Sequence, residues 1–220
     1  MNPAFGVLVN DLMRLDMVFR QSEISVDVPC HIIKMPETAT GGLNKLLGII
    51  EDNGHDVAIL AHQDMYFRSG WLDAVESQIA KLPDNWLCAG ISGKDMDGKI
   101  CGAMHDMRIP LHFKTSHEFP HPASCFDECA IIINTKHGFR FDKGLTGFDL
   151  YGTLCCLQAE ELGLSSWIIN AFAEHYCMRP FTWYPDKNFE ACFKWIYERF
   201  PNARRIDTTV LGVPEFKEEK

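Results

Sequence analysis

The sequence predicts an α/β fold in which helices flank a mostly parallel central sheet. Apolar runs of strand length alternate along the chain with stretches whose apolar residues recur at helical spacing. The 220 residues suffice for one domain with a continuous core, and neither an internal repeat nor a linker divides the sequence. We therefore expect residues 1–220 to form a single α/β domain.

The first half of the chain gives the clearest alternation of strands and helices. Leucines and isoleucines recur at i, i+3, i+4 and i+7 within residues 38–54, which predicts a helix. Thr38 or Thr40 would cap its start, and Gly54 would end it. The expected strands are residues 5–9, 28–35, 56–60 and 86–92, and the expected helices are residues 12–21, 38–54 and 71–83.

The second half is less regular where it begins. An Asp-Gly pair at residues 97–98 predicts a hairpin turn. Residues 105–124 contain three prolines and four histidines without a sustained period, so we expect a long loop there. These histidines lack the His-x-x-x-His spacing of a helical metal site, so we expect no second metal centre in the loop. Further strands are expected at residues 129–134 and 165–170, helices at residues 147–163 and 187–200, and a polar tail at residues 212–220.

Composition and charge argue against several classes of protein. Hydrophobic residues make up 46% and charged residues 23%, which is typical of a folded globular chain. The formal net charge of -9 argues against general affinity for nucleic acid or an anionic membrane surface. Nine cysteines, several of them in apolar runs, indicate buried thiols in a reducing compartment. We find no signal peptide and no apolar stretch of the about 20 residues that span a bilayer, so we expect a cytoplasmic protein without a transmembrane segment.

The apolar run at residues 57–61 ends in three polar side chains, His62, Gln63 and Asp64. In open α/β sheets, ligands bind beyond the carboxyl ends of the strands, which is where these side chains would lie. A carboxylate there can hold a hard divalent cation, and the cation in turn can hold a diphosphate. A triplet this short also recurs by chance, so on its own it favours an ordinary polar turn.

Four segments, taken in order, favour a cation site at this triplet over an ordinary polar turn. They are GGLNKLLGIIEDNGHD, AHQDMYFRSGWL, GFRFDKGLTGFDLYGTLCCLQAEELG and SSWIINAFAEHYC. Together they resemble the GT-A glycosyltransferases, particularly the family-two-like group that uses nucleotide-sugar donors, and the resemblance covers residues 5–180. It implies a Rossmann-like three-layer sandwich and a glycosyltransferase of the hexosyltransferase kind.

The resemblance implies a role for each matching position. The family's Asp-x-Asp signature is here a His-Gln-Asp variant, so Asp64 keeps the metal-binding position and His62 replaces the first aspartate. Gln63 would position a phosphate or a metal-bound water. Asn44 falls where the family's helix faces the donor, and His175 falls where the family has a late metal-binding histidine.

Asp149, in TGFDLYG, matches the family's catalytic base at an acidic helix start. The positive end of a helix keeps a carboxylate ionised, so Asp149 would accept the acceptor's proton, and transfer would invert the anomeric carbon. Without the resemblance, an ordinary first-turn carboxylate is the better interpretation. Asp127 and Glu128, before the strand at residues 129–134, are equally compatible with binding acceptor hydroxyls and with simple solvation.

The chain departs from the family at its N-terminus, where GVLVNDLMRL replaces the usual turn after the first strand. The nucleobase contacts are therefore open, with Asn10, Asp11 and Glu37 as candidates. Trp71 would either wall a sugar pocket or pack in the core, and we favour the core. Asp142 is expected to be a turn residue.

These assignments predict transfer of a sugar from a nucleotide-diphosphate sugar to a hydroxyl of a saccharide or glycoconjugate acceptor. A site with few protein ligands suits Mg²⁺ or Mn²⁺, and an imidazole ligand favours Mn²⁺. A non-catalytic protein that binds a nucleotide sugar or a glycan is the alternative, because the triplet is degenerate. The lack of a dense His/Asp cluster argues against an unrelated metal-dependent hydrolase.

Overall fold

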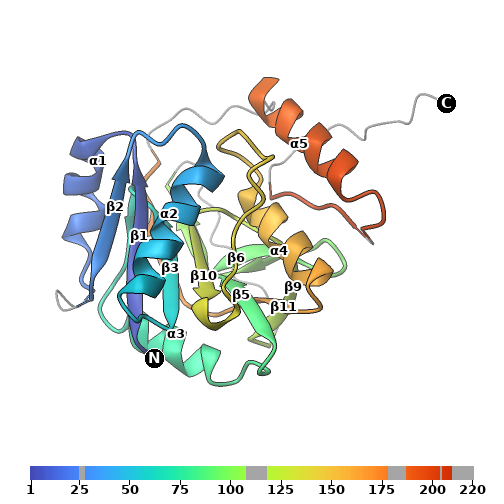
Figure 1. Ribbon diagram of the computed structural model, residues 1–220. Coiled ribbons are helices and arrows are strands. Elements are labelled where there is room, and N and C mark those ends of the chain that lie inside the picture. Colours follow the sequence, from blue (N-terminus) through green and yellow to red (C-terminus); the bar gives the residue numbers. More distant parts are fainter. Residues whose placement is uncertain (25–27, 108–117, 178–186, 204, 210–220) are drawn as a thin grey trace.

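A computed structural model describes residues 1–24, 28–107, 118–177, 187–203 and 205–209, and this part of the chain is a three-layer α/β sandwich (Figure 1). Within it, nine strands form one sheet in the order β2-β1-β3-β10-β5-β11-β9-β6-β7, and three short strands form a second sheet in the order β4-β12-β8. The strands of the large sheet are, in that order, Cys30–Lys34, Pro3–Val9, Val57–His62, Ala130–Asn134, Trp86–Gly90, Ser165–Ile168, His121–Phe126, Ser92–Asp95 and Ile100–Gly102. Those of the small sheet are Met65–Tyr66, Ala173–His175 and Met104–Asp106.

The strands of the large sheet do not all run the same way. β1 is parallel to β2 and β3, and β11 is parallel to β5. β10 lies antiparallel between β3 and β5, and β9 and β7 are reversed as well, so six of the described strands run one way and three the other. The predicted α/β sheet flanked by helices is confirmed, with these reversed strands set into it.

Helices cover both faces of the large sheet. Strand residues alternate between the faces, so Ala58 and Leu60 join one core and Ile59 and Ala61 join the other. Helices α2, α4 and α5 pack in the first core, and α1, the 3₁₀ turn η1 and α3 pack in the second. Their bounds are Leu12–Met17 (α1), Phe19–Gln21 (η1), Ala39–Asp52 (α2), Trp71–Ile79 (α3), Tyr151–Glu161 (α4) and Lys187–Arg199 (α5).

Helix α2 forms where its apolar stripe predicts. Thr38 is the N-cap, and its hydroxyl accepts a hydrogen bond from the Gly41 N–H at 3.1 Å. Thr40 instead donates to the Leu145 carbonyl at 2.9 Å, inside the core. Gly54, after the helix, has a φ of +78°, a backbone conformation that glycine adopts readily.

Three expectations about local structure are wrong. The helix expected at residues 12–21 ends at Met17, because the backbone at Val18 leaves the helical region and resumes as a 3₁₀ turn. The helix expected from Gly147 begins at Tyr151, because Leu150 has a left-handed φ of 65° that a continuous helix cannot contain. The expected loop carries β8 at one end and β9 at the other, since both ends pair with distant strands. Residues 108–117 of that loop and the expected polar tail at residues 212–220 lie outside the described part of the chain.

The cysteines behave as small buried hydrophobic residues. The described residues include all nine of them, each is a thiol rather than half of a disulfide, and seven are buried. In the described part of the chain, every helix is too short or too polar to cross a bilayer.

Candidate functional site

The turn that follows β3 lies at the edge of the large sheet where the parallel strands β1, β2 and β3 end. Asp64 lies in this turn, and the small sheet holds His175 beside it, because β12 pairs with β4 and the Tyr176 N–H donates to the Asp64 carbonyl at 2.8 Å. β10 is antiparallel, so it begins at this same edge: the His62 N–H donates to the Cys129 carbonyl at 2.9 Å. The site therefore gathers residues from three distant parts of the sequence.

Asp64 and His175 contact each other directly. Asp64 Oδ1 lies 3.3 Å from His175 Nε2, and the two residues are only 6% and 4% exposed. Two ligand atoms about 2.1 Å from one cation, at about 90–109° to each other, lie about 3.0–3.4 Å apart, so this spacing fits a shared ion. The Cys177 sulfur completes a group whose ligand atoms all lie within 4.8 Å of one another. Arg14 Nη1 lies 3.8 Å from the other carboxylate oxygen of Asp64.

His175 is held between two carboxylates. Its Nδ1 lies 3.1 Å from Oδ2 of the buried Asp106, which sits opposite it in the β8–β12 pairing. Burial opposes the charged imidazolium, yet Cys129 and the hydrogen bonds to Asp106 and Asp64 together raise the pKa of His175 well above its ordinary value. The imidazolium therefore bridges the two carboxylates, and a cation that binds either ring nitrogen must displace the proton there.

Asp64 is ionised at neutral pH. Burial acts to raise the pKa of this carboxyl group, but the hydrogen bond and positive charge of His175, with a smaller electrostatic contribution from His62, lower it to about 2. An ionised carboxylate is the form that binds a divalent cation.

His62, the last residue of β3, faces the same region. Its Nε2 lies 2.8 Å from the Tyr151 hydroxyl, which donates its own proton to the Glu128 carbonyl at 3.2 Å. A phenol has one proton, so the hydroxyl accepts from His62, whose ring proton is therefore on Nε2. The His62 ring centroid lies 5.7 Å from that of His175.

Asp149 and Glu128 both lie near the start of α4. Asp149 is half-buried in the bend just before the helix, and Glu128 Oε1 accepts from the Gly152 N–H at 3.4 Å. Burial, followed by the negative charges of Asp127 and Asp149, raises the pKa of Glu128 to about 8. Glu128 therefore holds a proton at neutral pH, which makes it a candidate for proton transfer that the sequence left undecided.

Two residues expected at the donor site are held in other roles. The Asn44 side chain donates to the Phe141 carbonyl and accepts from the Phe141 N–H, both at 2.8 Å, so it joins α2 to a distant loop rather than facing a donor. The Gln63 oxygen accepts from the backbone N–H groups of Asn10 and Asp11 at 3.1 and 3.0 Å. Gln63 thus fixes the turn after β1, and we leave Asn44 out of the candidate site.

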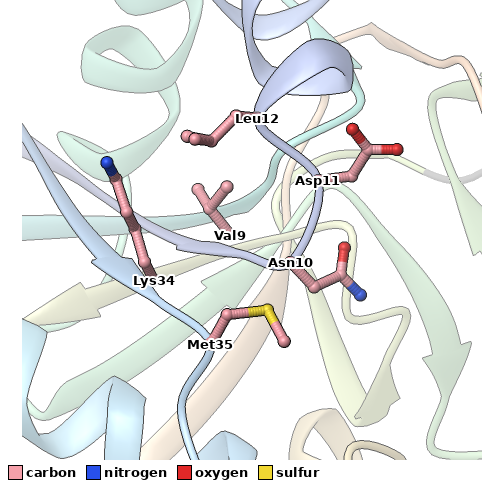
Figure 2. A pocket seen from close by; sticks show the side chains of 6 residues that line it. All are labelled: Val9, Asn10, Asp11, Leu12, Lys34 and Met35. Atoms are coloured by element: carbon pink, nitrogen blue, oxygen red, sulfur yellow. The ribbon is translucent and has the colours of Figure 1, made fainter.

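A pocket opens where β1 and β2 end (Figure 2). It has a volume of about 340 Å³, within the range of small-molecule sites. Asn10 and Asp11, two of the expected nucleobase contacts, line it, and Gln63 ties both to the turn that carries Asp64. Glu37, the third candidate, is exposed and does not line this pocket. The pocket is lined by Val9, Asn10, Asp11, Leu12, Lys34 and Met35.

Trp71 and Asp142 are structural residues. Trp71 is 3% exposed in the core and donates from Nε1 to the Ala171 carbonyl at 3.2 Å. Asp142 accepts from the Gly144 N–H at 2.9 Å and from Arg199 at 3.0 Å, so it closes a turn and fastens α5.

Comparison by sequence gives little. No protein-family model matches the chain. The protein "ATP synthase subunits region ORF 6" of Fuscovulum blasticum is 25% identical over 125 residues, or 54% of this chain and 50% of that protein. The chain thus spans about half the length of this curated relative, whose name states no activity.

Solved structures agree on the fold. GalNAc-T7 with UDP, GalNAc and Mn²⁺ matches with a TM-score of 0.56 and 12% identity over 88% of this chain and 48% of its own. S. aureus TarS residues 1–349 with UDP-GlcNAc matches with a TM-score of 0.55 and 11% identity, over 93% of this chain and 68% of its own. The mannosyltransferase PcManGT of Pyrobaculum calidifontis, with GDP-Man and Mn²⁺, matches with a TM-score of 0.52 and 6% identity, over 90% of this chain and 61% of its own. The chain spans about half of GalNAc-T7. At such identities the likeness establishes the fold and nothing further, and the chain adopts the Rossmann-like GT-A fold of these glycosyltransferases.

Proposed function

We propose that this protein is a metal-dependent glycosyltransferase that moves a sugar from a nucleotide-diphosphate sugar to a hydroxyl of a saccharide or glycoconjugate, with inversion. The observation that carries the proposal is the 3.3 Å contact between Asp64 and His175 at the carboxyl edge of a GT-A sheet. Proteins of this fold have been solved with UDP-GlcNAc, with GDP-Man and Mn²⁺, and with UDP, GalNAc and Mn²⁺.

Asp64 and His175 would hold Mn²⁺ or Mg²⁺ at the donor diphosphate. A bound cation would offset the negative charge that develops on the leaving nucleoside diphosphate. The Arg14 guanidinium, 3.8 Å from Asp64, would add positive charge beside the same phosphates. His62, oriented by Tyr151, would contact the donor from the end of β3.

Asp149 would be the general base. Glu128 beside it holds a proton at neutral pH, because burial and its acidic neighbours raise its pKa to about 8. A neutral Glu128 does not repel the second carboxylate, so Asp149 would carry the charge that accepts the proton of the acceptor hydroxyl.

A non-catalytic protein that binds a nucleotide sugar or a glycan is the second candidate. Two observations favour it: His62 stands where the resemblance to the GT-A family would place a carboxylate, and the guanidinium of Arg14 already lies near Asp64.

A panel of nucleotide sugars, screened for thermal stabilisation with and without Mn²⁺, tests donor binding, since a ligand of the native state raises apparent stability. Release of nucleoside diphosphate with saccharide acceptors then tests transfer. Asp64→Asn is expected to abolish the Mn²⁺-dependent stabilisation, and Asp149→Asn to keep it but lose the release. Asp16→Asn, at an exposed position of α1, is the matched control.

Each outcome decides between the candidates. Donor binding without release by the unmodified protein would favour the binding protein. Unchanged Mn²⁺-dependent donor binding in Asp64→Asn would overturn the metal assignment.

A further inference from the structure

The two ring nitrogens of His175 contact different kinds of ligand atom. Nε2 faces a carboxylate oxygen of Asp64 at 3.3 Å. Nδ1 faces the sulfur of Cys129 at 3.4 Å, with Asp106 at 3.1 Å. The Nε2 side of the imidazole therefore offers a carboxylate oxygen, which suits a hard cation, whereas the Nδ1 side offers a sulfur ligand beside a carboxylate, which suits a softer one.

His62 adds a third ligand to the sulfur side. Within the part of the chain that the structure describes, His62, Cys129 and His175 each offer one ligand atom within 4.8 Å of the other two. The Tyr151 hydroxyl fixes the His62 proton on Nε2, so the nitrogen that carries a lone pair is Nδ1. A neighbour that holds the second ring nitrogen in this way is the usual support of a metal-binding histidine.

The spacing of the group fits zinc. With Zn–S of about 2.3 Å, Zn–N of about 2.0–2.1 Å and tetrahedral angles, a sulfur and a nitrogen on one zinc ion lie about 3.5 Å apart. The observed distance from Cys129 Sγ to His175 Nδ1 is 3.4 Å, so these two side chains fit one zinc ion where they stand. Both are almost fully buried, with exposures of 3% and 4%, whereas His62 is half-buried and lies toward solvent.

We propose that His62, Cys129 and His175 form a zinc site with two imidazoles and one thiolate. Three protein ligands leave a fourth position to water or another oxygen, as in zinc sites that exchange a ligand. Mn²⁺ and Mg²⁺ prefer oxygen ligands and would not select this group.

The zinc site removes His175 as a ligand for a cation on the Asp64 side, because a neutral imidazole binds metal through one nitrogen at a time. Zinc on the sulfur side leaves the Nε2 proton directed at Asp64, and a cation beside Asp64 leaves the Nδ1 proton directed at Asp106. This consequence rests on the proposed function: zinc would compete with the Mn²⁺ that supports donor binding.

Cobalt substitution tests the zinc site without any nucleotide sugar. The full chain, stripped by a chelator and titrated with Co²⁺, is expected to show a sulfur-to-cobalt charge-transfer band that Zn²⁺ displaces. Cys129→Ser is expected to lose the band and to weaken zinc binding more than about 100-fold, since even the loss of a residue that supports a ligand costs about 10- to 100-fold. Cys177→Ser, on the Asp64 side, is the matched control and is expected to keep the band.

A band that persists in Cys129→Ser, or that is lost only in Cys177→Ser, would overturn the inference. X-ray absorption of the zinc-loaded unmodified protein gives a second measurement that needs no variant. One sulfur neighbour at about 2.3 Å is expected, and a shell of nitrogen and oxygen alone, or no zinc uptake, would refute the site. Neither measurement depends on transfer, so a failed zinc site and a failed glycosyltransferase proposal are told apart.

Discussion

Glu128 should make the stability of this protein fall as pH rises. Its pKa is raised from 4.5 to about 8, chiefly by burial and then by the charges of Asp127 and Asp149. Between these two pH values the unfolded chain has lost this proton and the native state has kept it, so the native state binds more protons and is favoured at the acid end. At about 1.4 kcal/mol per tenfold change in the ionisation constant, the difference corresponds to about 5 kcal/mol of unfolding free energy lost by about pH 9.

Glu128→Gln tests this, because glutamine resembles the protonated carboxyl and does not ionise. Urea unfolding, followed by circular dichroism at about pH 4, 7 and 9, should give closely similar unfolding free energies for both proteins at the acid end. Near pH 9 the variant should be more stable by about 5 kcal/mol. Glu37→Gln, which removes an exposed carboxylate, is the control and should follow the unmodified protein. Equal pH slopes for the unmodified protein and Glu128→Gln would refute the reasoning.

Three further substitutions test other contacts. Asp106→Asn leaves His175 with one carboxylate, so Mn²⁺ affinity in the presence of donor, measured by calorimetry, should fall about 10- to 100-fold; an unchanged affinity would show that Asp106 does not orient the imidazole. Thr38→Ala removes the cap of α2 and should lower the unfolding free energy in urea by about 1 kcal/mol, with Thr38→Ser as a control that keeps the hydroxyl. Leu46→Ala opens a cavity at a fully buried site and should cost about 2–5 kcal/mol in the same assay, whereas Ile49→Ala on the exposed side of that helix should cost far less; equal costs would contradict the packing described.

The sequence predicted the elements that local chemistry specifies. The stripe of α2 and its cap at Thr38 lie within a few residues of one another, so periodicity and capping rules were enough. Strand β8 carries no such local signal, because it exists through pairing of Met104 and Asp106 with Ala173 and His175. Rules that examine short stretches of sequence do not detect pairing between strands about 70 residues apart.

The same distinction applies to the candidate site. Asp64 was identified locally, as the carboxylate that ends an apolar run, whereas His175 came from a family resemblance and not from any pattern around it. Both polar groups of the Asn44 side chain, which was expected to face the donor, bond to Phe141, 97 residues away. Gln63 was expected to face phosphate and instead bonds to the turn at Asn10, 53 residues earlier. A side chain's position in the sequence does not reveal which distant backbone groups it satisfies.

The direction of one strand decides what the site contains. The run at residues 129–134 reads as a buried strand in either direction, so the sequence did not show which of its ends lies beside Asp64. Because β10 is antiparallel between β3 and β5, its first residues, rather than its last, lie at the carboxyl edge. That reversal brings Glu128 to the start of α4 and Cys129 to His175. In a parallel sheet the far end of this run, at Asn134, would occupy that edge, and it offers neither a carboxyl group nor a thiol. The proton-transfer candidate and the thiol ligand therefore both follow from strand topology, which is why only the folded chain reveals them.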